Sequence, residues 1–137
     1  MAETGKLAFE LVSPEELVVS ENVEMVVCPG ALGEFGVLYR HAPMIAALKP
    51  GVLGICHQGR DLDTRYFVAG GFADVTGERC TVLAEHPIDV STIDRGEVET
   101  ALKNARDDLA DAKSDRERKT AQQRIDLNEA KLRALRR

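Results

Sequence analysis

The sequence contains few aromatic residues and no long apolar run. Of its 137 residues, 4% are Phe, Tyr or Trp, and tryptophan is absent. No apolar stretch approaches the roughly 20 residues that a membrane-spanning helix needs. Residues 1–6 lack both the apolar core of a secretory signal and the Arg-rich character of a transit peptide. We therefore expect a protein on the cytosolic side that meets a membrane only through a partner.

Cysteine is scarce, and the chemistry that it could support is missing. Cys28, Cys56 and Cys80 are far apart, and no pair has the spacing of metal ligands. All three lie in apolar stretches, so we expect small buried hydrophobic residues rather than disulfides. The histidines pair with no cysteine, and no nucleophile elbow or phosphate-binding loop is present. These absences predict a protein that has neither an active site nor a cofactor.

The first two thirds of the chain have the pattern of short strands. Apolar residues alternate in residues 7–12, and short runs rich in β-branched residues occur at 25–28, 52–56, 64–68 and 80–83. Ten of the eleven glycines and all five prolines fall before residue 89, as the turns between strands require. This pattern predicts an antiparallel β-sandwich of about ten strands over residues 1–88.

The remainder, residues 89–137, has the period of helices. Apolar residues recur at helical spacing from Val98 to Ala112, and a second, thinner stripe runs from Ala121 to Leu135. We expect Ser91 or Thr92 to cap the first helix, and Ser114 or Asp115 to cap the second. Two helices joined by a short turn predict an antiparallel hairpin, so the fold class is α+β and mainly β. The alanine-rich second stripe predicts a hairpin that opens more easily than the sandwich unfolds.

The net charge of −5 is unevenly distributed. Residues 1–93 carry 13 acidic and 6 basic residues, whereas residues 116–137 carry 8 basic and 3 acidic residues. A basic end indicates an anionic partner surface, or a solvated helix face with alternating charges. Nucleic-acid binding is not favoured, because the basic end contains no aromatic residue.

Two blocks of sequence carry a family resemblance. The first is PGALGEFGVLYRHAPMIAALKPG, residues 29–51, and the second is FVAGGFADV, residues 67–75, followed by VLAE at 82–85. Together with the two-helix tail, they resemble the epsilon subunit of bacterial proton-translocating ATP synthases, the counterpart of mitochondrial delta. Against this resemblance we weigh an adaptor outside that complex, a nucleic-acid-binding module and a small hydrolase, which share fewer of these features.

The resemblance implies a non-catalytic central-stalk subunit on the cytoplasmic face of the inner membrane. Its sandwich would bind the gamma subunit and rest on the c-ring, and it would couple proton transport to ATP synthesis. The family's ring-contact positions match Glu34 and His41 here. The sequence departs from the family at Tyr39 and Arg40, where Pro-Gly is usual, and Arg40 adds a cation beside this contact.

The resemblance also implies two possible roles for the tail. In bacterial members the helices can extend and block ATP hydrolysis by contacting the catalytic alpha and beta subunits. Some members bind ATP through an Ile/Leu-Asp-x-x-Arg-Ala motif; here Ile93 and Asp94 match, Glu97 replaces the arginine, and Arg95 is the nearest substitute. We expect no tight ATP binding. The basic residues available for the inhibitory contact are Arg116, Arg118, Lys119, Arg124, Lys131, Arg133 and Arg136.

Overall fold

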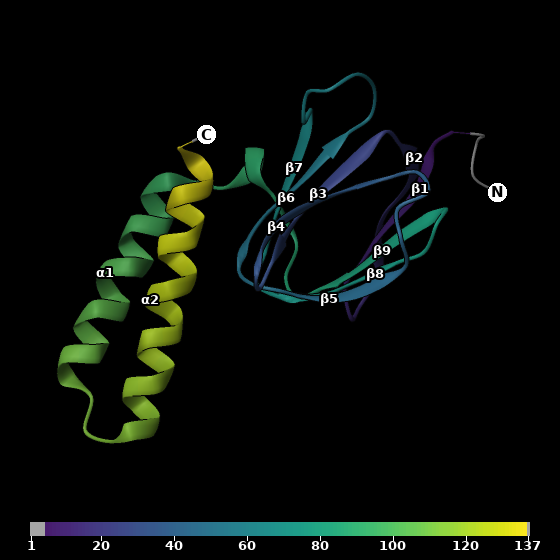
Figure 1. Cartoon of the computed structure of the whole chain (residues 1–137). Coiled ribbons are helices and arrows are strands. Elements are labelled where there is room, and N and C mark those ends of the chain that lie inside the picture. Colours follow the sequence, from purple (N-terminus) through teal and green to yellow (C-terminus); the bar gives the residue numbers. More distant parts are fainter. Residues whose placement is uncertain (1–4, 137) are drawn as a thin grey trace. The chain divides into compact units, whose positions relative to one another are not determined.

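The computed structural model describes residues 5–136 of the chain, which form two compact units. One unit ends at Asp89 and the other begins at Val90. The first contains ten strands, which confirms the predicted sandwich (Figure 1). The strands are β1 Leu7–Val12, β2 Leu17–Val23, β3 Met25–Gly30, β4 Gly33–Leu38, β5 Met44–Leu48, β6 Gly51–Cys56, β7 Thr64–Val68, β8 Gly71–Val75, β9 Arg79–Ala84 and β10 Ile88–Asp89.

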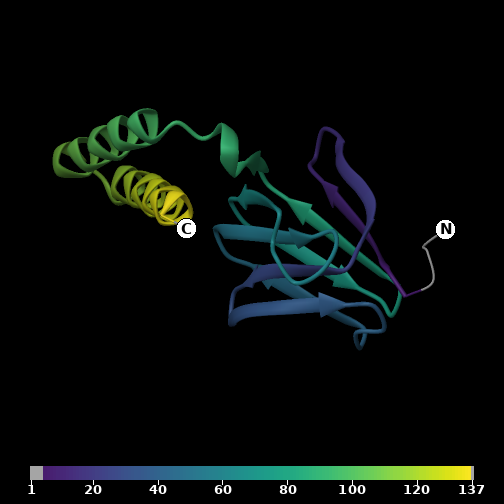
Figure 2. The same cartoon turned by 90° about the horizontal axis from the view of Figure 1, so that it is seen from above.

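The strands form two facing layers (Figures 1 and 2). The hydrogen-bonded order is β10-β7-β6-β3-β5-β8-β9-β1-β2, and β4 pairs with β3 outside this path. The path turns from one layer to the other at the pair Gly30 and Leu48, where β3 meets β5. One layer is therefore β10-β7-β6-β3-β4, and the other is β5-β8-β9-β1-β2. Most neighbours are antiparallel, but β1 and β9 run parallel.

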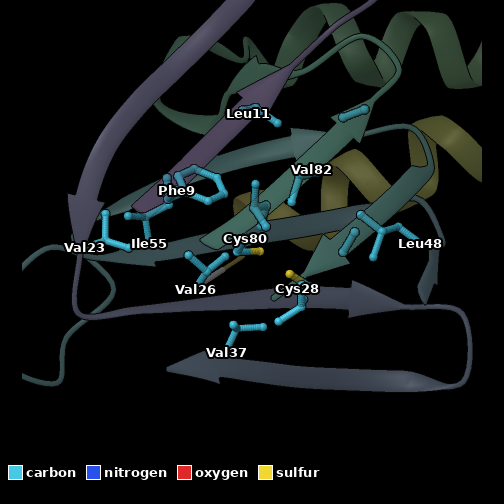
Figure 3. Packing of buried hydrophobic residues seen from close by; sticks show 14 of the residues in the cluster. Phe9, Leu11, Val23, Val26, Cys28, Val37, Leu48, Ile55, Cys80 and Val82 are labelled. Carbon is cyan, nitrogen blue, oxygen red and sulfur yellow. The ribbon is translucent and has the colours of Figure 1, made fainter. Parts of the chain in front are cut away.

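The alternation in β1 places its apolar residues in the core between the layers. Leu7, Phe9 and Leu11 are fully buried, while the residues between them are partly exposed. This is the period of two that a strand imposes on its side chains. Figure 3 shows Phe9 among Val23, Ile55 and other residues of the same cluster. Burial of this apolar surface is the main term that stabilises the sandwich.

The three cysteines are free and buried, as the sequence predicts. Cys28 on β3 and Cys80 on β9 come from opposite layers, and their sulfur atoms point toward one another (Figure 3). A hydrogen bond between these thiols, together with burial, raises the pKa of Cys28 far above its ordinary value. Such thiols pack as small apolar side chains and are poor nucleophiles.

The second unit is the predicted helical hairpin. A short 3-10 helix, η1 Val90–Thr92, precedes α1 Arg95–Asp111 and α2 Asp115–Leu135. The seam between the two α-helices contains Leu102, Ala105 and Ile125, with Leu109 and Leu132 packed beside them. Asn128 is also buried, and its Nδ2 donates to the backbone oxygen of Arg124 at 2.8 Å. The seam therefore combines small, aliphatic and polar side chains.

The cap of the first helix differs from our expectation. Ser91 and Thr92 lie within η1, so the N-cap of α1 is Asp94. Its Oδ1 accepts from the backbone N–H of Glu97 at 3.2 Å. Sequence reasoning missed it because the 3-10 turn shifts the start of the α-helix toward the C-terminus. The second helix is capped by Ser114, one of the two expected residues, which accepts from Glu117 N–H at 3.1 Å.

Candidate interaction surfaces

An apolar row crosses the outer face of the β5-β8-β9-β1-β2 layer. The strand registers place Ala47 opposite Phe72, Phe72 opposite Leu83, Leu83 beside Val12, and Val12 opposite Leu17. Paired residues on neighbouring strands project from the same face of a sheet. The row therefore contains one apolar residue from each of the five strands. We call it the apolar row.

Three members of the apolar row are more than half exposed. The exposed fractions are 56% for Phe72, 53% for Leu83 and 55% for Leu17. The next row on the same face is polar over most of its length, because Asp74, Thr81 and Glu10 follow in register. Single exposed apolar residues are ordinary, but an aligned set with a polar border is typical of a protein contact surface. Sequence alternation could not identify this row, since it depends on registers between distant strands.

A second surface follows β4, a strand at the edge of the other layer. Glu34, Gly36 and Leu38 alternate along its exposed face, while Val37 points into the core. Arg40 and His41 lie in the turn that follows the strand, two and three residues after Leu38. At about 3.3 Å per residue, Glu34 and Leu38 are about 13 Å apart along β4, and the turn that carries Arg40 and His41 begins only there. The residues that we expected at the c-ring are thus spread along one edge of the sandwich rather than gathered at one point.

The loop after β4 has a defined backbone geometry. Arg40 adopts a φ of +70° and its N–H donates to the carbonyl of Gly77 at 2.6 Å. The His41 N–H donates to the carbonyl of Leu38 at 3.0 Å, which closes the turn. The Arg40 guanidinium lies 5.7 Å from the centre of the Tyr39 ring. Arg40 therefore takes the left-handed conformation that glycine adopts most readily.

The His41 side chain has one nitrogen engaged and one available. Its Nδ1 lies 2.7 Å from the carbonyl oxygen of Ala42. A carbonyl accepts, so Nδ1 carries the proton of the neutral ring, and Nε2 remains as an acceptor. Nε2 of His41 can thus accept a hydrogen bond from a partner. This suits hydrogen bonding to polar groups on a partner loop.

The basic residues of α2 are distributed around the helix. Since successive residues are about 100° apart, Arg118, Arg133 and Arg136 share one flank, and Arg124 and Lys131 share the opposite flank. Arg124 Nη1 donates to Asp108 Oδ2 at 2.9 Å, which ties α2 to α1, and Arg118 pairs with Asp115. The folded hairpin therefore does not present these residues on a single face. Arg116 and Lys119 are exposed on the remaining outer face.

The stretch that resembles an ATP motif has structural roles in this chain. Asp94 caps α1, and Arg95 Nη1 lies 3.9 Å from Glu99 Oε1 on the next turn. Glu97 stands in the first turn, where a carboxylate stabilises the helix but repels phosphate. Ile93 is partly buried, and its N–H donates to the carbonyl of Val90. In the described part of the chain, no group of three or more His, Cys, Asp or Glu side chains is placed to hold a metal ion.

The two units match two family models. Residues 6–89 match the beta-sandwich domain of the ATP synthase delta/epsilon chain, and residues 94–137 match the C-terminal domain of the ATP synthase epsilon chain. The chain belongs to the ATP synthase epsilon family. This confirms the resemblance carried by the two sequence blocks. Among residues 5–136, no helix is long and apolar enough to cross a membrane.

Two bacterial relatives match this chain over most of its length. The ATP synthase epsilon chain of Rhodospirillum centenum is 48% identical over 131 residues, which cover 93% of this chain and 90% of that one. The epsilon chain of Rhodospirillum rubrum is 47% identical over 134 residues, or 98% of both chains. The match therefore spans both units.

Solved structures share the fold at lower identity. A chain in the mitochondrial ATP synthase OSCP/F1/c-ring structure of Euglena gracilis superposes with a TM-score of 0.85 at 23% identity, covering 96% of this chain and 82% of that one. A chain in the central stalk/c-ring structure of the Tetrahymena thermophila enzyme gives 0.67 at 16% identity, covering 95% and 96%. These likenesses support the two-unit fold.

Proposed function

We propose that this chain is a non-catalytic rotor subunit that couples proton flow through the c-ring to ATP synthesis in the catalytic head. It binds the gamma subunit and the c-ring, and it lies at the cytoplasmic face of the bacterial inner membrane as a peripheral part of the complex. Its membership of the epsilon family carries this proposal. Torque passes through protein contacts, so the subunit needs no cofactor and no catalytic side chain.

The apolar row is the surface that we assign to gamma. A permanent contact inside a rotor must resist sliding, and apolar cores are typical of such interfaces. Phe72 and Leu83 lie opposite one another at the middle of the row, where an aromatic anchor contributes most to binding. The polar row beside it supplies a border that can hydrogen-bond to the partner.

The β4 edge and the loop after it are the surface that we assign to the c-ring. Glu34, Arg40 and His41 lie along it, so it carries a carboxylate, a guanidinium and an imidazole group. Charged and polar contacts of this kind fix position more than they add affinity. A contact surface that follows β4 for about 13 Å from Glu34 to Leu38 and then includes the turn would meet more than one polar group of the ring.

The hairpin is the element that we assign to inhibition of ATP hydrolysis. The exposed residues Arg116, Arg118, Lys119, Arg133 and Arg136 can meet acidic surfaces of the alpha and beta subunits. The seam holds few large side chains and a buried Asn128, so separating the helices costs less than unfolding the sandwich. Breaking the pair of Arg124 and Asp108 would release two further charges.

Co-purification and hydrolysis assays test this function. The tagged full-length chain and a variant that ends before residue 94 are each expressed with the rest of the complex. Recovery of both with the catalytic head and the c-ring, and faster ATP hydrolysis after truncation, are the expected results. Failure of the full-length chain to co-purify would reject the assignment, whereas an unchanged hydrolysis rate would reject inhibition alone.

A charge substitution on full-length chains tests the inhibitory contact more narrowly. Replacing Arg116, Arg118 and Lys119 by glutamine should raise the hydrolysis rate if α2 meets the catalytic subunits. The matched control replaces Lys103, Arg106 and Lys113 by glutamine, which removes the same charge from α1 and the turn. Equal effects of the two triple variants would point to net charge rather than to α2.

A further inference from the structure

His57 lies between two carboxylates that come from different parts of the sandwich. It directly follows β6, and Asp63 directly precedes β7, so both belong to the β6–β7 loop. Glu21 belongs to β2, the last strand in the order of the other layer. The ring Nε2 is 2.6 Å from Glu21 Oε1, and Nδ1 hydrogen-bonds to Asp63 Oδ1. The imidazole thus links strand β2 of one layer to the β6–β7 loop of the other layer.

This arrangement requires the doubly protonated ring. A carboxylate accepts and does not donate, so both ring nitrogens must carry a proton to satisfy both partners. A neutral imidazole has one N–H and leaves a lone pair facing the second carboxylate. The two carboxylates raise the pKa of His57 above its ordinary value of 6.5, with Asp63 the larger cause and partial burial opposing them. The charged form therefore persists above pH 6.5.

The two partners are not held equally. Asp63 also accepts from the backbone N–H of His57 at 2.9 Å and from the Thr64 hydroxyl at 3.0 Å, so it stays in place whatever the charge of the ring. Glu21 reaches the ring from another layer. After deprotonation the one remaining ring proton therefore stays on Nδ1, where it donates to Asp63, and the contact of Nε2 with Glu21 changes from attraction to repulsion.

Tyr66, a titratable group near the cluster, does not change its charge in this pH range. Tyr66 on β7 is close enough to Asp89 and Glu21 that both, after burial as the larger cause, raise its pKa above the ordinary value of 10.0. It remains neutral while His57 loses its proton. The charge change in this range therefore comes from the histidine.

We propose that His57 is a pH-operated clasp that joins strand β2 to the β6–β7 loop through Glu21 when it is protonated and loses this contact when it is not. The proton goes to solvent, because the side chain of His57 is 35% exposed. The sign is fixed by the direction of the pKa shift: the link is complete below pH 6.5 and is lost as the pH rises through the folded-state value. Strand β2 also carries Leu17 of the apolar row, but the clasp does not depend on the assignment of that row to gamma.

Nuclear magnetic resonance of the isolated full-length chain tests the clasp. The ring signals of His57 are followed with pH, and hydrogen exchange of the β2 amides is measured over the same range and corrected for the intrinsic pH dependence of exchange. The expected result is a His57 midpoint above 6.5 and a loss of β2 protection across that midpoint. The loss should be about 1.4-fold to 5-fold, the range for an exposed ion pair.

Two variants and a control decide the outcome. Glu21→Gln removes the negative charge that favours the protonated ring, so it should lower the His57 midpoint. Because glutamine can hydrogen-bond to either form of the ring, it should also remove the pH dependence of β2 exchange. His57→Gln should remove that dependence as well. Glu15→Gln removes the same charge from the exposed turn before β2 and should change neither quantity. The proposal is overturned if β2 protection stays constant through the His57 titration, or if Glu21→Gln leaves the midpoint unchanged.

Discussion

At the scale of single residues, Arg40 occupies a backbone conformation with a φ of +70° that costs most residues free energy. The left-handed region costs a non-glycine residue about 1–2 kcal/mol. When such a residue is compared with glycine, the measured difference in stability is smaller, because glycine has greater freedom in the unfolded chain. Stacking of Arg40 on Tyr39 recovers some of this cost. Arg40 therefore lowers the stability of the fold. This cost is consistent with the proposed c-ring contact, in which the charge of Arg40 would be used.

The backbone term can be measured with a pair of substitutions. Arg40→Gly and Arg40→Ala both remove the charge and the stacking, but only glycine relieves the backbone. We expect the glycine variant to be more stable than the alanine variant by about 1 kcal/mol in urea unfolding. Equal stability of the two variants would mean that the loop relaxes to a negative φ.

Asp63 provides a test of the acidic side of the His57 cluster. Hydrogen bonds from the backbone and then the side chain of His57 lower the pKa of Asp63 below its ordinary value of 3.8. A lowered carboxyl pKa stabilises the fold above pH 3.8, and this contribution is lost as the pH falls through the folded-state value. Asp63→Asn should therefore lower the urea midpoint at pH 7 and at pH 5, with a smaller difference at pH 3. A difference that grows toward pH 3 would contradict this assignment.

At the scale of secondary-structure elements, Gly71 fixes the close approach of β8 and β9. Its φ is +136°, and a Cβ at this position would lie 2.0 Å from the carbonyl oxygen of Leu83. Because a backbone atom blocks the space, Gly71→Ala should cost at least about 3 kcal/mol of unfolding free energy. Gly77→Ala is the control, since a Cβ there meets nothing within 4 Å. Thermal unfolding of the full chain should separate the two variants clearly; similar losses would refute the steric argument.

The hairpin should become harder to open when its buried polar residue is replaced. Asn128 donates to the Arg124 carbonyl, which also accepts the helical N–H of residue 128, so Asn128→Leu leaves no buried group unsatisfied. A buried asparagine in a helical seam lowers stability, and leucine should add about 1 kcal/mol. Hydrogen exchange in α1 and α2 should slow about fivefold, while Asn104→Leu on the exposed face of α1 should change it little. No slowing would mean that the seam is not what holds the hairpin closed.

Element types followed from local pattern, whereas some boundaries and contacts did not. The alternation of Leu7, Phe9 and Leu11 and the helical spacing after Val98 predicted the correct elements, because burial on one face sets both periods. The N-cap was misplaced because η1 occupies Val90–Thr92, and local propensity does not distinguish a 3-10 turn from a helix start. The His57 cluster was missed because Glu21 is 36 residues away in sequence.

At the scale of the whole molecule, the contact surfaces depend on strand register. Glu34 and His41 could be named from the family pattern, but their separation follows only from the strand and the turn between them. The apolar row required four pairings among five strands, one of them parallel. Long-range pairings of this kind leave no local signal in a single sequence.

The two proposed surfaces predict a separation of partners within the assembled enzyme. Phe72 on the apolar row and Leu38 on the β4 edge are 56% and 55% exposed, so serine at either position should alter stability little and equally. If Phe72 is a central anchor, Phe72→Ser should weaken binding to a gamma-containing catalytic head without its ring by about tenfold or more. Leu38→Ser should bind that head normally and instead weaken recovery of the c-ring with the complex.

This pair of variants distinguishes the two surfaces because each serves as the control for the other. Binding to the ring-free head is measured by titration with labelled full-length chain, and ring recovery is measured after purification of the whole complex. A rotor subunit must stay bound to both gamma and the c-ring while the ring turns, so loss of either contact should uncouple proton flow from synthesis. Should Phe72→Ser bind the head normally while Leu38→Ser does not, the faces would have to be exchanged: gamma would meet the β4 edge, and the apolar row would face the ring.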